Sequence, residues 1–381
     1  MREDWEYKKL EDISSSVLIE KAKKRFSPND VIRYIDISSI DNINQCLTGT
    51  ISFKMLDAPS RAQQKVEYGD ILISTVRPNL RNIAIVNDDA TNLVASSGFC
   101  VLRINDAALR RYIFYYVVSN KFTAYLEKLT NGANYPAVKE TDVRKALIPI
   151  PPKPTQLSIV TELDKLNELI QIKKEQLKDY DTLAQSIFYE MFGDPVVNEK
   201  GWEVISLSEL SMYPNERIAI NQLSPSQYVG VENLIKDRGG VRFSNSLPKA
   251  NSAIAYKEND ILLGNIRPYL KKIWLADKSG GASGDVVIIR ISNRKITPVF
   301  LFKVLSSDSF FEYDNTYTKG AKMPRGDRKA IAKFGVILPP LPLQQSFAHK
   351  IEQIERQKAS VQKTISDLEM LLAARMQHWF D

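Results

Sequence analysis

Apolar residues recur at alternating spacings of three and four in two long stretches of this chain. The first stretch covers residues 154–193 and the second covers residues 342–381. This spacing is that of a coiled-coil seam, and each stretch follows a proline-rich segment that cannot be helical. We therefore predict two helices of about 37 residues, each about 55 Å long at 1.5 Å per residue. The seam positions that carry this prediction are Leu163, Leu166, Ile170, Leu177, Tyr180, Ile351, Ile354, Val361, Ile365 and Leu368.

Each predicted helix follows a segment of short apolar runs that alternate with turn residues. In the first half the runs at 31–37, 71–76 and 99–104 have strand composition. Residues 107–129 are predicted as one helix with an apolar and aromatic face. Residues 202–338 repeat this order.

The second half of the chain repeats motifs of the first half. The segment 70–81, which begins Asp-Ile-Leu and ends in Arg-Pro-Asn-Leu-Arg, returns at 260–271. The proline run that starts at Pro151 returns 188 positions later at Pro339. A long repeat of this kind predicts two similar domains and a two-fold-like molecule made from one chain.

The predicted fold class is α+β, with two strand-rich domains in tandem. A single amphipathic helix is usually the core stripe of a bundle, but two long helices, each behind a strand-rich domain, are better explained by antiparallel pairing with each other. The predicted division is a first domain at 1–153, a long helix at 154–193, a second domain at 194–341 and a long helix at 342–381. The two helices are then an antiparallel coiled coil that places the domains at opposite ends of a rod, with pseudo-two-fold symmetry.

Composition and charge limit the possible function classes and cellular location but do not identify a function. The formal net charge is +7 and the hydrophobic fraction is 44%. A mildly basic chain permits nucleic-acid binding, but many cytosolic enzymes have a similar charge. Cys46 and Cys100 have no counterparts in the other repeat, so no disulfide framework is expected and the cytoplasm is the expected location. No apolar run is long enough to cross a membrane, and residues 1–5 lack the apolar core expected of a signal peptide.

The residues needed for catalysis or metal binding are missing from the predicted domains. The two histidines, His349 and His378, both fall in the second long helix. No Ser-His-Asp triad or His/Cys metal site can therefore be built in the domains, and no glycine-rich phosphate loop is present. Asp70 and Asp260 precede strands, and for both a hydrogen-bonding role in a turn is favoured over acid-base catalysis. No catalytic residue, metal or cofactor is predicted.

The duplicated order of these motifs resembles the DNA-specificity subunit of type I restriction-modification systems. The resemblance rests on the Asp-Ile-Leu…Arg-Pro segments at 70–81 and 260–271 and on the Pro-Pro-x-Pro-x-Gln runs before both helices. It implies two target-recognition domains that each read one half of a split site in double-stranded DNA, with the helices as a spacer. It also implies two methylation subunits and restriction/translocase subunits as partners, and no catalytic role for this chain itself.

The Arg-Pro segments are the first candidates for DNA contact. Proline fixes the backbone there, and long cationic side chains project from a loop. Because both copies keep Arg-Pro while the two domains are expected to read different sequences, bracing or phosphate contact is favoured over base readout for the two arginines. The candidates are Arg77, Asn79, Arg81, Arg267, Tyr269, Lys271 and Lys272.

A second candidate is the loop before the last strand of each domain, at 131–139 and 319–328. Both copies share the frame Gly-Ala-x-x-Pro and differ within it, as a common scaffold with two specificities should. Amides suit adenine and cations suit guanine or phosphate, although a solvated loop is the alternative. The candidates are Asn134, Tyr135, Lys139, Lys319, Lys322 and Arg325.

Two other functions compete with this reading. The chain could act with a methyltransferase alone, since a restriction subunit is a separate polypeptide. It could also be a structural adaptor that binds proteins or glycans, although the basic charge and the repeated Arg-Pro segments disfavour an adaptor.

Overall fold

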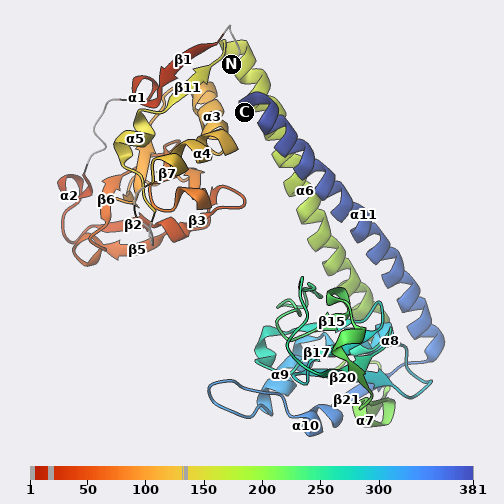
Figure 1. The fold of residues 1–381 in the computed structure, drawn as a ribbon. Coiled ribbons are helices and arrows are strands. Elements are labelled where there is room, and N and C mark those ends of the chain that lie inside the picture. Colours follow the sequence, from red (N-terminus) through yellow and green to blue (C-terminus); the bar gives the residue numbers. More distant parts are fainter. Residues whose placement is uncertain (1–4, 16–20, 131, 133–135, 381) are drawn as a thin grey trace. The chain divides into compact units, whose positions relative to one another are not determined.

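The computed structural model describes residues 5–15, 21–130, 132 and 136–380. It divides into two compact units (Figure 1). The first unit holds residues 1–174 and 363–381, and the second unit holds residues 175–362. Two long helices, α6 (Lys153–Phe192) and α11 (Leu341–Phe380), contribute to both units.

The first unit is rich in short strands. In chain order its elements besides α6 and α11 are β1 (Glu6–Lys9), α1 (Leu10–Ile13), α2 (Ala22–Arg25), β2 (Val31–Ile35), η1 (Ile37–Ser39), β3 (Ile40–Asp41), β4 (Cys46–Leu47), β5 (Ile51–Lys54), η2 (Met55–Asp57), β6 (Ala62–Lys65), β7 (Ile71–Ser74), η3 (Pro78–Leu80), β8 (Ile83–Ile85), β9 (Leu93–Ser96), β10 (Phe99–Leu102), α3 (Ala107–Val117), α4 (Asn120–Lys128), α5 (Glu140–Arg144) and β11 (Leu147–Ile150).

The second unit has a similar order. Its elements besides α6 and α11 are β12 (Glu203–Ser206), α7 (Leu207–Leu210), β13 (Ser211–Met212), β14 (Arg217–Ala219), η4 (Ile220–Gln222), η5 (Pro225–Gln227), β15 (Tyr228–Val229), β16 (Ser252–Tyr256), β17 (Ile261–Gly264), η6 (Pro268–Leu270), β18 (Ile273–Leu275), β19 (Gly280–Ala282), β20 (Val286–Ile291), α8 (Pro298–Leu305), α9 (Asp308–Thr316), α10 (Arg328–Ala332) and β21 (Gly335–Leu338).

Corresponding strands pair in the same way in the two units. Strand β7 lies between β10 and β8, and β17 lies between β20 and β18, all antiparallel. A second sheet has the order β5–β2–β9–β6 in the first unit, where β2 and β9 are the parallel pair. In the second unit the order is β14–β16–β19–β15, where β15 and β19 are the parallel pair, so β2, β9 and β6 correspond to β15, β19 and β16 and the edge strands β5 and β14 differ. The strand pairs β1–β11 and β12–β21 are equivalent as well. Both units are therefore built on one scaffold.

The repeated Asp-Ile-Leu segments form the central strands β7 and β17. All four residues of each strand are buried. In β7, Ile71 and Ile73 face one apolar core and Leu72 faces another, and β17 is packed in the same way. A strand covered on both faces reads as an unbroken apolar run instead of an alternating one, which explains this repeated pattern.

The repeated proline runs end in a buried glutamine that fixes the start of each long helix. The side-chain amide of Gln156 donates to the carbonyl of Pro151 at 2.8 Å. Gln344 donates to Pro339, also at 2.8 Å. Each glutamine satisfies a carbonyl that the proline-rich entry into the helix leaves without a backbone partner.

The prediction of one helix over residues 107–129 was wrong, because α3 and α4 are separate helices. Helix α3 ends at Val117, and the hydroxyl of Ser119 accepts a hydrogen bond from the backbone N–H of Phe122 to cap α4. Ser307 caps α9 in the same way through Phe310. The apolar face continues across the break, so the pattern alone hid a serine N-cap.

The prediction that the two long helices pack together is confirmed, and they run side by side in Figure 1. In the first unit Arg375 of α11 is paired with Glu162 of α6, and Lys174 is paired with Glu369 at 3.1 Å. One residue number rises as the other falls, so the two segments are antiparallel. In the second unit Lys358 is paired with Asp181 at 2.8 Å. These ion pairs are partly exposed, so they contribute little to stability, and their main effect is to set the register of the two helices.

The ends of the long helices pack into the apolar cores of the units as well as against each other. Phe380 at the end of α11 packs on Tyr112 of α3, with ring centroids 5.5 Å apart. In the second unit Phe192 of α6 packs on Phe300 of α8 and on Phe347 of α11. The heptad pattern predicted helix pairing, but the terminal turns are core helices of a mixed domain.

The predicted seam residues lie between the two helices or in these cores. Leu163 and Ile170 on α6 are buried, as are Val361 and Ile365 on α11. Leu166, Ile351 and Ile354 are also buried, and Leu177, Tyr180 and Leu368 are partly exposed. The predicted division at residues 153, 193 and 341 stays a prediction, because the compact units cut across both helices.

Candidate nucleic-acid interface

A buried ion pair supports the repeated segment in each unit. The carboxylate of Asp70 accepts two hydrogen bonds of 2.8 Å from the guanidinium of Arg103. Asp260 and Arg290 form the same bidentate pair in the second unit. Both carboxylates also accept the backbone N–H three residues earlier, which agrees with the predicted turn role. This pair joins the start of β7 to the end of β10, and the start of β17 to β20, at the end of each central strand opposite the Arg-Pro turn.

The Arg-Pro turns have an unusual backbone. Arg77 has φ 49° and ψ 62°, and Arg267 has φ 53° and ψ 65°. This left-handed conformation is uncommon for residues other than glycine and costs about 1–3 kcal/mol. Both arginine side chains are exposed, while Pro78 and Pro268 are buried. The same strained geometry in both units points to a defined role for the turn.

In the first unit the Arg-Pro turn is hydrogen-bonded to the second candidate loop. The backbone N–H of Arg77 donates to the carbonyl of Pro136 at 2.7 Å. The N–H of Val138 donates to the carbonyl of Thr75 at 2.9 Å. Pro136 is the last residue of the Gly-Ala-x-x-Pro frame, so the two segments predicted separately form one surface.

The second unit makes the same connection. The N–H of Arg267 donates to Pro324 at 2.8 Å, and the N–H of Gly326 donates to Asn265 at 3.1 Å. Pro324 again closes the Gly-Ala-x-x-Pro frame. In both units the structure therefore joins a turn that the two units share to a loop whose residues differ between them.

The loop of the second unit is pinned at its base and exposed at its tip. Lys319 and Arg325 exchange two backbone hydrogen bonds of 2.9 Å. The side chain of Arg325 pairs with Asp285 at 3.1 Å, and that of Lys319 pairs with Asp327. Lys322 lies between them and is exposed. Lys322 is thus the cation best placed to contact a ligand.

The cationic residues at the end of each Arg-Pro turn contact the start of α4 in the first unit and of α9 in the second. Arg81 donates to the side-chain carbonyl of Asn120 at 2.6 Å. Lys271, in the equivalent position, pairs with Asp308. Both have left-handed backbone angles, with φ values of 51° and 50°. In the structure these side chains hold α4 and α9 against the turns, and their contact with DNA stays a prediction.

The other predicted contact residues differ in how well they are placed. Asn79 and Tyr269 are exposed in the turns, and Lys139 is exposed just before α5. The ammonium of Lys272 donates to the carbonyl of Val231 at 2.7 Å. Two further predicted residues lie outside the described residues: Asn134 and Tyr135.

Sequence reasoning missed a third segment beside each Arg-Pro turn. In the first unit the side-chain amide of Asn42 donates to the carbonyl of Leu80 at 2.9 Å. In the second unit the backbone N–H of Asp237 donates to the carbonyl of Leu270 at 2.9 Å. These segments share no motif. The signal that could have found them is only a cluster of Asp, Asn and Gly, which indicates a turn and no partner.

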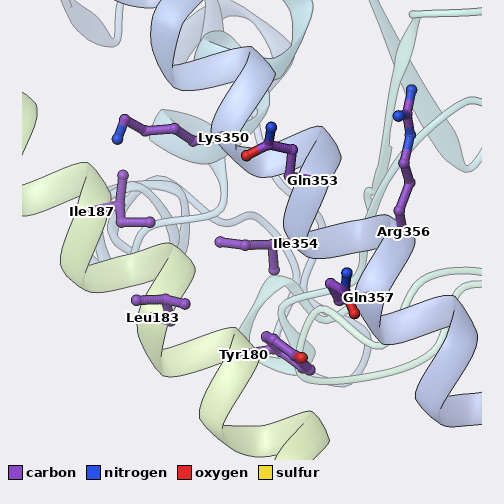
Figure 2. Close-up of a pocket in the computed structure, with 8 residues that line it drawn as sticks. All are labelled: Tyr180, Leu183, Ile187, Lys350, Gln353, Ile354, Arg356 and Gln357. Carbon is purple, nitrogen blue, oxygen red and sulfur yellow. The ribbon is translucent and has the colours of Figure 1, made fainter.

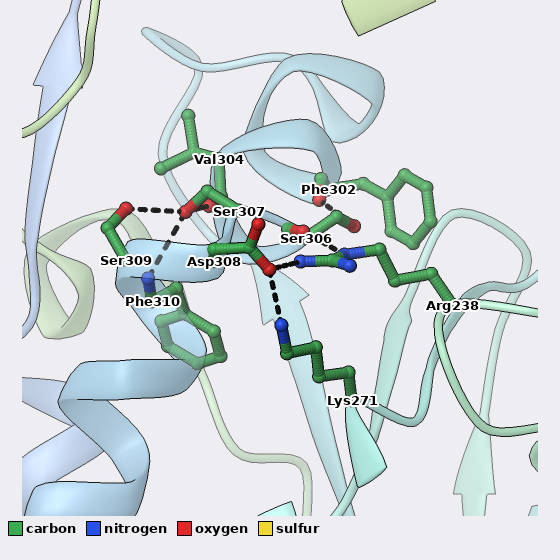
Figure 3. A network of polar contacts seen from close by, with 9 residues as sticks. All are labelled: Arg238, Lys271, Phe302, Val304, Ser306, Ser307, Asp308, Ser309 and Phe310. Carbon is green, nitrogen blue, oxygen red and sulfur yellow. Dashed lines mark hydrogen bonds and ion pairs between the residues drawn. The ribbon is translucent and has the colours of Figure 1, made fainter. Parts of the chain in front are cut away.

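Arg238 belongs to this third segment and joins a polar network (Figure 3). Its guanidinium bonds the carboxylate of Asp308 and the carbonyl of Ser306, and lies 5.5 Å from the centre of the Phe311 ring. Hydrogen bonds from Lys271 and then Arg238 lower the pKa of Asp308 to about 2. Asp308 therefore stays ionised and keeps the turn, the third segment and α9 together near neutral pH.

A polar niche lies beneath the loop of the second unit. We use this name for Asn265, Asp314 and Gly326. Asp314 is 1% exposed, and neither of its carboxylate oxygens has a hydrogen-bond partner among the described residues. The side-chain oxygen of Asn265 is likewise unpaired within that part of the chain. Burial raises the pKa of Asp314 to about 6. A Cβ on Gly326 would lie 2.5 Å from the Asp314 carboxylate, so only glycine fits beside it.

The first unit has apolar residues in place of two niche residues. Leu126 corresponds to Asp314, and Val138 corresponds to Gly326, while Thr75 replaces Asn265. Leu126 and Val138 are buried in the apolar core. The backbone hydrogen bond between the strand end and the loop is nevertheless kept in both units.

A second candidate surface lies on the helix pair in the second unit (Figure 2). A cavity of about 570 Å³ opens between α6 and α11. Leu183 and Ile187 face Ile354 across it, with Lys350 and Arg356 among the other lining residues. Leu183 is 46% exposed. An open apolar groove with a basic rim is suited to contact with another protein.

Features of other functional classes are missing from the described part of the chain. There, no group of three or more His, Cys, Asp or Glu side chains is arranged to hold a metal ion. None of the helices in the described ranges is long and apolar enough to cross a membrane.

Comparison with known proteins agrees with this geometry. Residues 2–179 match the family described as type I restriction modification DNA specificity domain. The first half of the chain is thus similar to that family, and the chain resembles type I specificity subunits. The predicted resemblance is thereby confirmed, and the relatives are named as the specificity subunits of type I restriction enzymes, in agreement with the predicted non-catalytic class.

Two relatives show how far the similarity extends. The chain is 25% identical over 241 residues to the type I restriction enzyme HindI specificity subunit of Haemophilus influenzae, covering 59% of this chain and 51% of that subunit. It is 24% identical over 416 aligned positions to the MjaIX specificity subunit of Methanocaldococcus jannaschii, covering 97% of this chain and 90% of that subunit. The chain thus spans about half of the first relative and most of the second.

Two solved structures share the fold. A chain from a study of complex assembly and conformational transition of the type I R-M system has a TM-score of 0.60 at 21% identity, covering 100% of this chain and 98% of that one. The type I restriction-modification S subunit from M. genitalium has a TM-score of 0.53 at 12% identity, covering 99% and 96%. The mixed α/β fold with two long packed helices is therefore that of known S subunits.

Proposed function

We propose that this chain is the DNA-binding specificity subunit of a type I restriction-modification system and reads a bipartite target. Each domain recognises one half-site in double-stranded DNA, and the antiparallel helices set the gap between the half-sites. The proposed domains are the predicted ones, 1–153 and 194–341. The chain itself carries no catalytic step and acts in the cytoplasm.

One observation carries this proposal. In both units an Arg-Pro turn with the same backbone is hydrogen-bonded to a loop whose residues differ between the units. Phosphate contacts position a protein on DNA, and base contacts specify the sequence. The cationic turn shared by the units is suited to phosphate contact, and the loop that differs between them is suited to base contact.

Within this proposal the predicted residues have different roles in DNA contact. Arg77, Arg267 and Tyr269 lie on the turns and contact phosphates. Lys322 at the loop tip of the second unit reaches a guanine or a phosphate, and Asn134 in the first loop reaches an adenine. Arg81, Lys271 and Lys272 contribute positive charge while they brace the turns.

The helix pair is the proposed docking site for the partner subunits. Two methylation subunits bind the specificity subunit, and restriction/translocase subunits join them. The groove beside Leu183 and Ile354 supports such an interface, because it exposes apolar surface between two helices with a basic rim. Assembly with a methyltransferase alone is equally compatible with this surface.

Mapping methylated adenines tests the whole proposal. The chain is expressed with its methylation subunit in a host that lacks other adenine methylation, and the genome is sequenced for modified bases. The expected result is one split motif with a fixed gap. The matched control expresses the methylation subunit alone and should show no such motif. A continuous motif, or methylation that is independent of this chain, would contradict the proposal.

A further inference from the structure

A pocket of about 300 Å³ in the first unit lies outside the two candidate segments predicted from the sequence. It is bounded by the loop between β3 and β4, the turn before β7, and helix α3. Its polar lining residues include Gln45, Tyr68, Asn87, Arg110 and Arg111. These side chains supply amide, phenol and guanidinium donors. No carboxylate is among the described residues that line the pocket.

Arg110 and Arg111 are the two cations that line this pocket, and they differ in their partners. Its guanidinium lies so close to Gly69 that a Cβ there would be 2.2 Å from Nη1. Arg111 pairs with Asp164 at 2.7 Å and lies 5.1 Å from the centre of the Phe114 ring. Among the described residues, none of the ion pairs involves Arg110, although its side chain is partly buried. A half-buried cation in a pocket without carboxylates favours an anionic ligand.

The second unit lacks this feature, so it is not part of the shared scaffold. Asn259 takes the place of Gly69 and makes the same backbone hydrogen bond, to Ala276 at 2.8 Å. The position equivalent to Arg110 is Pro298, and Asp277 stands where the first unit has Asn87. The second unit thus lacks the arginine and has an acidic residue at these equivalent positions.

The pocket adjoins the candidate nucleic-acid interface through one loop. Gln45 lines the pocket and donates to the carbonyl of Asn42, and Asn42 donates to Leu80 of the Arg-Pro turn. We propose that the pocket binds a backbone phosphate of DNA beside the half-site of the first domain, with Arg110 as the main ligand. A guanidinium fits two phosphate oxygens at once, whereas a lysine offers only a point charge. This inference rests on the proposed function.

The salt dependence of DNA binding tests the proposal. The assembled complex with its methylation subunits is titrated with a fluorescent duplex that carries the mapped target, at several KCl concentrations. Losing one phosphate contact lowers the slope of log K against log salt by about 0.9. Arg110→Ala should show that smaller slope and bind about tenfold more weakly at moderate salt. Arg110→Lys should keep the slope and bind with intermediate affinity.

Arg294→Ala is the matched control, because Arg294 is an exposed arginine of the second unit outside the proposed contacts. It should bind like the wild type. Thermal melting of each variant checks that folding is retained. If Arg110→Ala binds DNA with the wild-type slope, the phosphate site is overturned. Weaker assembly with methylation subunits at unchanged DNA affinity would instead assign the pocket to a protein carboxylate, which also overturns it.

Neutral phosphates separate this inference from the proposed function. Methylphosphonates are placed one at a time in the backbone flanking the half-site of the first domain. At one position the wild type should lose affinity while Arg110→Ala loses no more. Equal losses in both proteins at every position would reject the site although the chain binds DNA. Failure of the wild-type complex to bind any duplex would reject the proposed function itself.

Discussion

The two units keep the same backbone under the candidate interface but fill it with different side chains. In the second unit the polar niche places under the loop a buried carboxylate that has no hydrogen-bond partner among the described residues. In the first unit Leu126 and Val138 fill the equivalent space with apolar groups. The hydrogen bonds that fasten the loop to the end of the central strand survive this exchange. The loop is therefore fastened by backbone hydrogen bonds, which allow the side chains around it to differ between the units.

A change in the helices should affect both units alike and gives the largest expected effect. We expect that four residues inserted next to Leu177 in α6, with four more next to Val361 in α11, lengthen the helix pair by about 6 Å. At 3.4 Å per base pair, the recognised gap should widen by about two base pairs, and binding to the original target should be lost. Methylome mapping measures the gap. An unchanged gap would show that the helices do not set it.

The buried ion pair should matter equally in the two units. Asp70→Asn and Asp260→Asn each remove the buried carboxylate from a mostly buried arginine, which keeps only a more exposed partner, Glu67 for Arg103 and Glu216 for Arg290. Breaking a buried pair typically costs about 3–5 kcal/mol, so each variant should lower the free energy of unfolding by about 3 kcal/mol. Urea unfolding followed by circular dichroism measures this. Glu258→Gln, at an exposed carboxylate of the same turn, is the control and should change stability little. A large cost in one unit alone would refute the shared frame.

The polar niche should give the second unit a pH dependence that the first unit lacks. The pKa of Asp314 is about 6 in the folded chain, above the ordinary value of 3.8. The folded state therefore binds more protons than the unfolded state in this range, and stability should fall by about 3 kcal/mol as pH rises from 4 to above 6.

Asp314→Asn and Asp314→Leu should both abolish this loss. Asp314→Leu introduces the residue of the first unit and should raise the stability of the second unit above pH 6. Urea unfolding at a series of pH values compares the variants. A wild-type profile that rises with pH and matches that of Asp314→Asn would contradict the burial of an unpaired carboxylate.

The smallest expected effect tests the cations of the second unit's loop, one at its tip and one at its base. Lys322→Ala together with Arg325→Ala should weaken binding of the target duplex by about 2 kcal/mol, since each contact is typically worth about 1–3 kcal/mol. Assembly with methylation subunits should be unaffected. Fluorescence anisotropy and size-exclusion chromatography measure the two properties. Unchanged DNA affinity would move base recognition to other loops.

The sequence predicted those parts of the fold that depend on local or repeated patterns. The heptads predicted α6 and α11, because a seam of this period is stable only against another helix. The unbroken apolar runs predicted β7 and β17. The pattern failed at Ser119, where the apolar face continues across a helix break, so that a single helix was expected in place of α3 and α4.

The candidate site could be predicted only in pieces. The Arg-Pro segments and the Gly-Ala-x-x-Pro loops were found from the repeat, and the structure joins them through Pro136 and Pro324. Asn42 and Arg238 were missed, since the third segments share no motif between the units. Their partners lie 38 residues or more away in the chain.

By itself, the sequence determined that this protein is a duplicated strand-rich domain with two long amphipathic helices, and that it resembles a DNA-specificity subunit. Periodicity, proline stops and repeats are local, so they survive without a structure. Only the tertiary structure decided which cations are tied to carboxylates, which carboxylate is buried without a partner, and which loops meet at the Arg-Pro turns. Those properties arise between residues that are distant in the chain but adjacent in space. Hydrogen bonding and burial depend on spatial neighbours, and a sequence pattern does not reveal which residues these are.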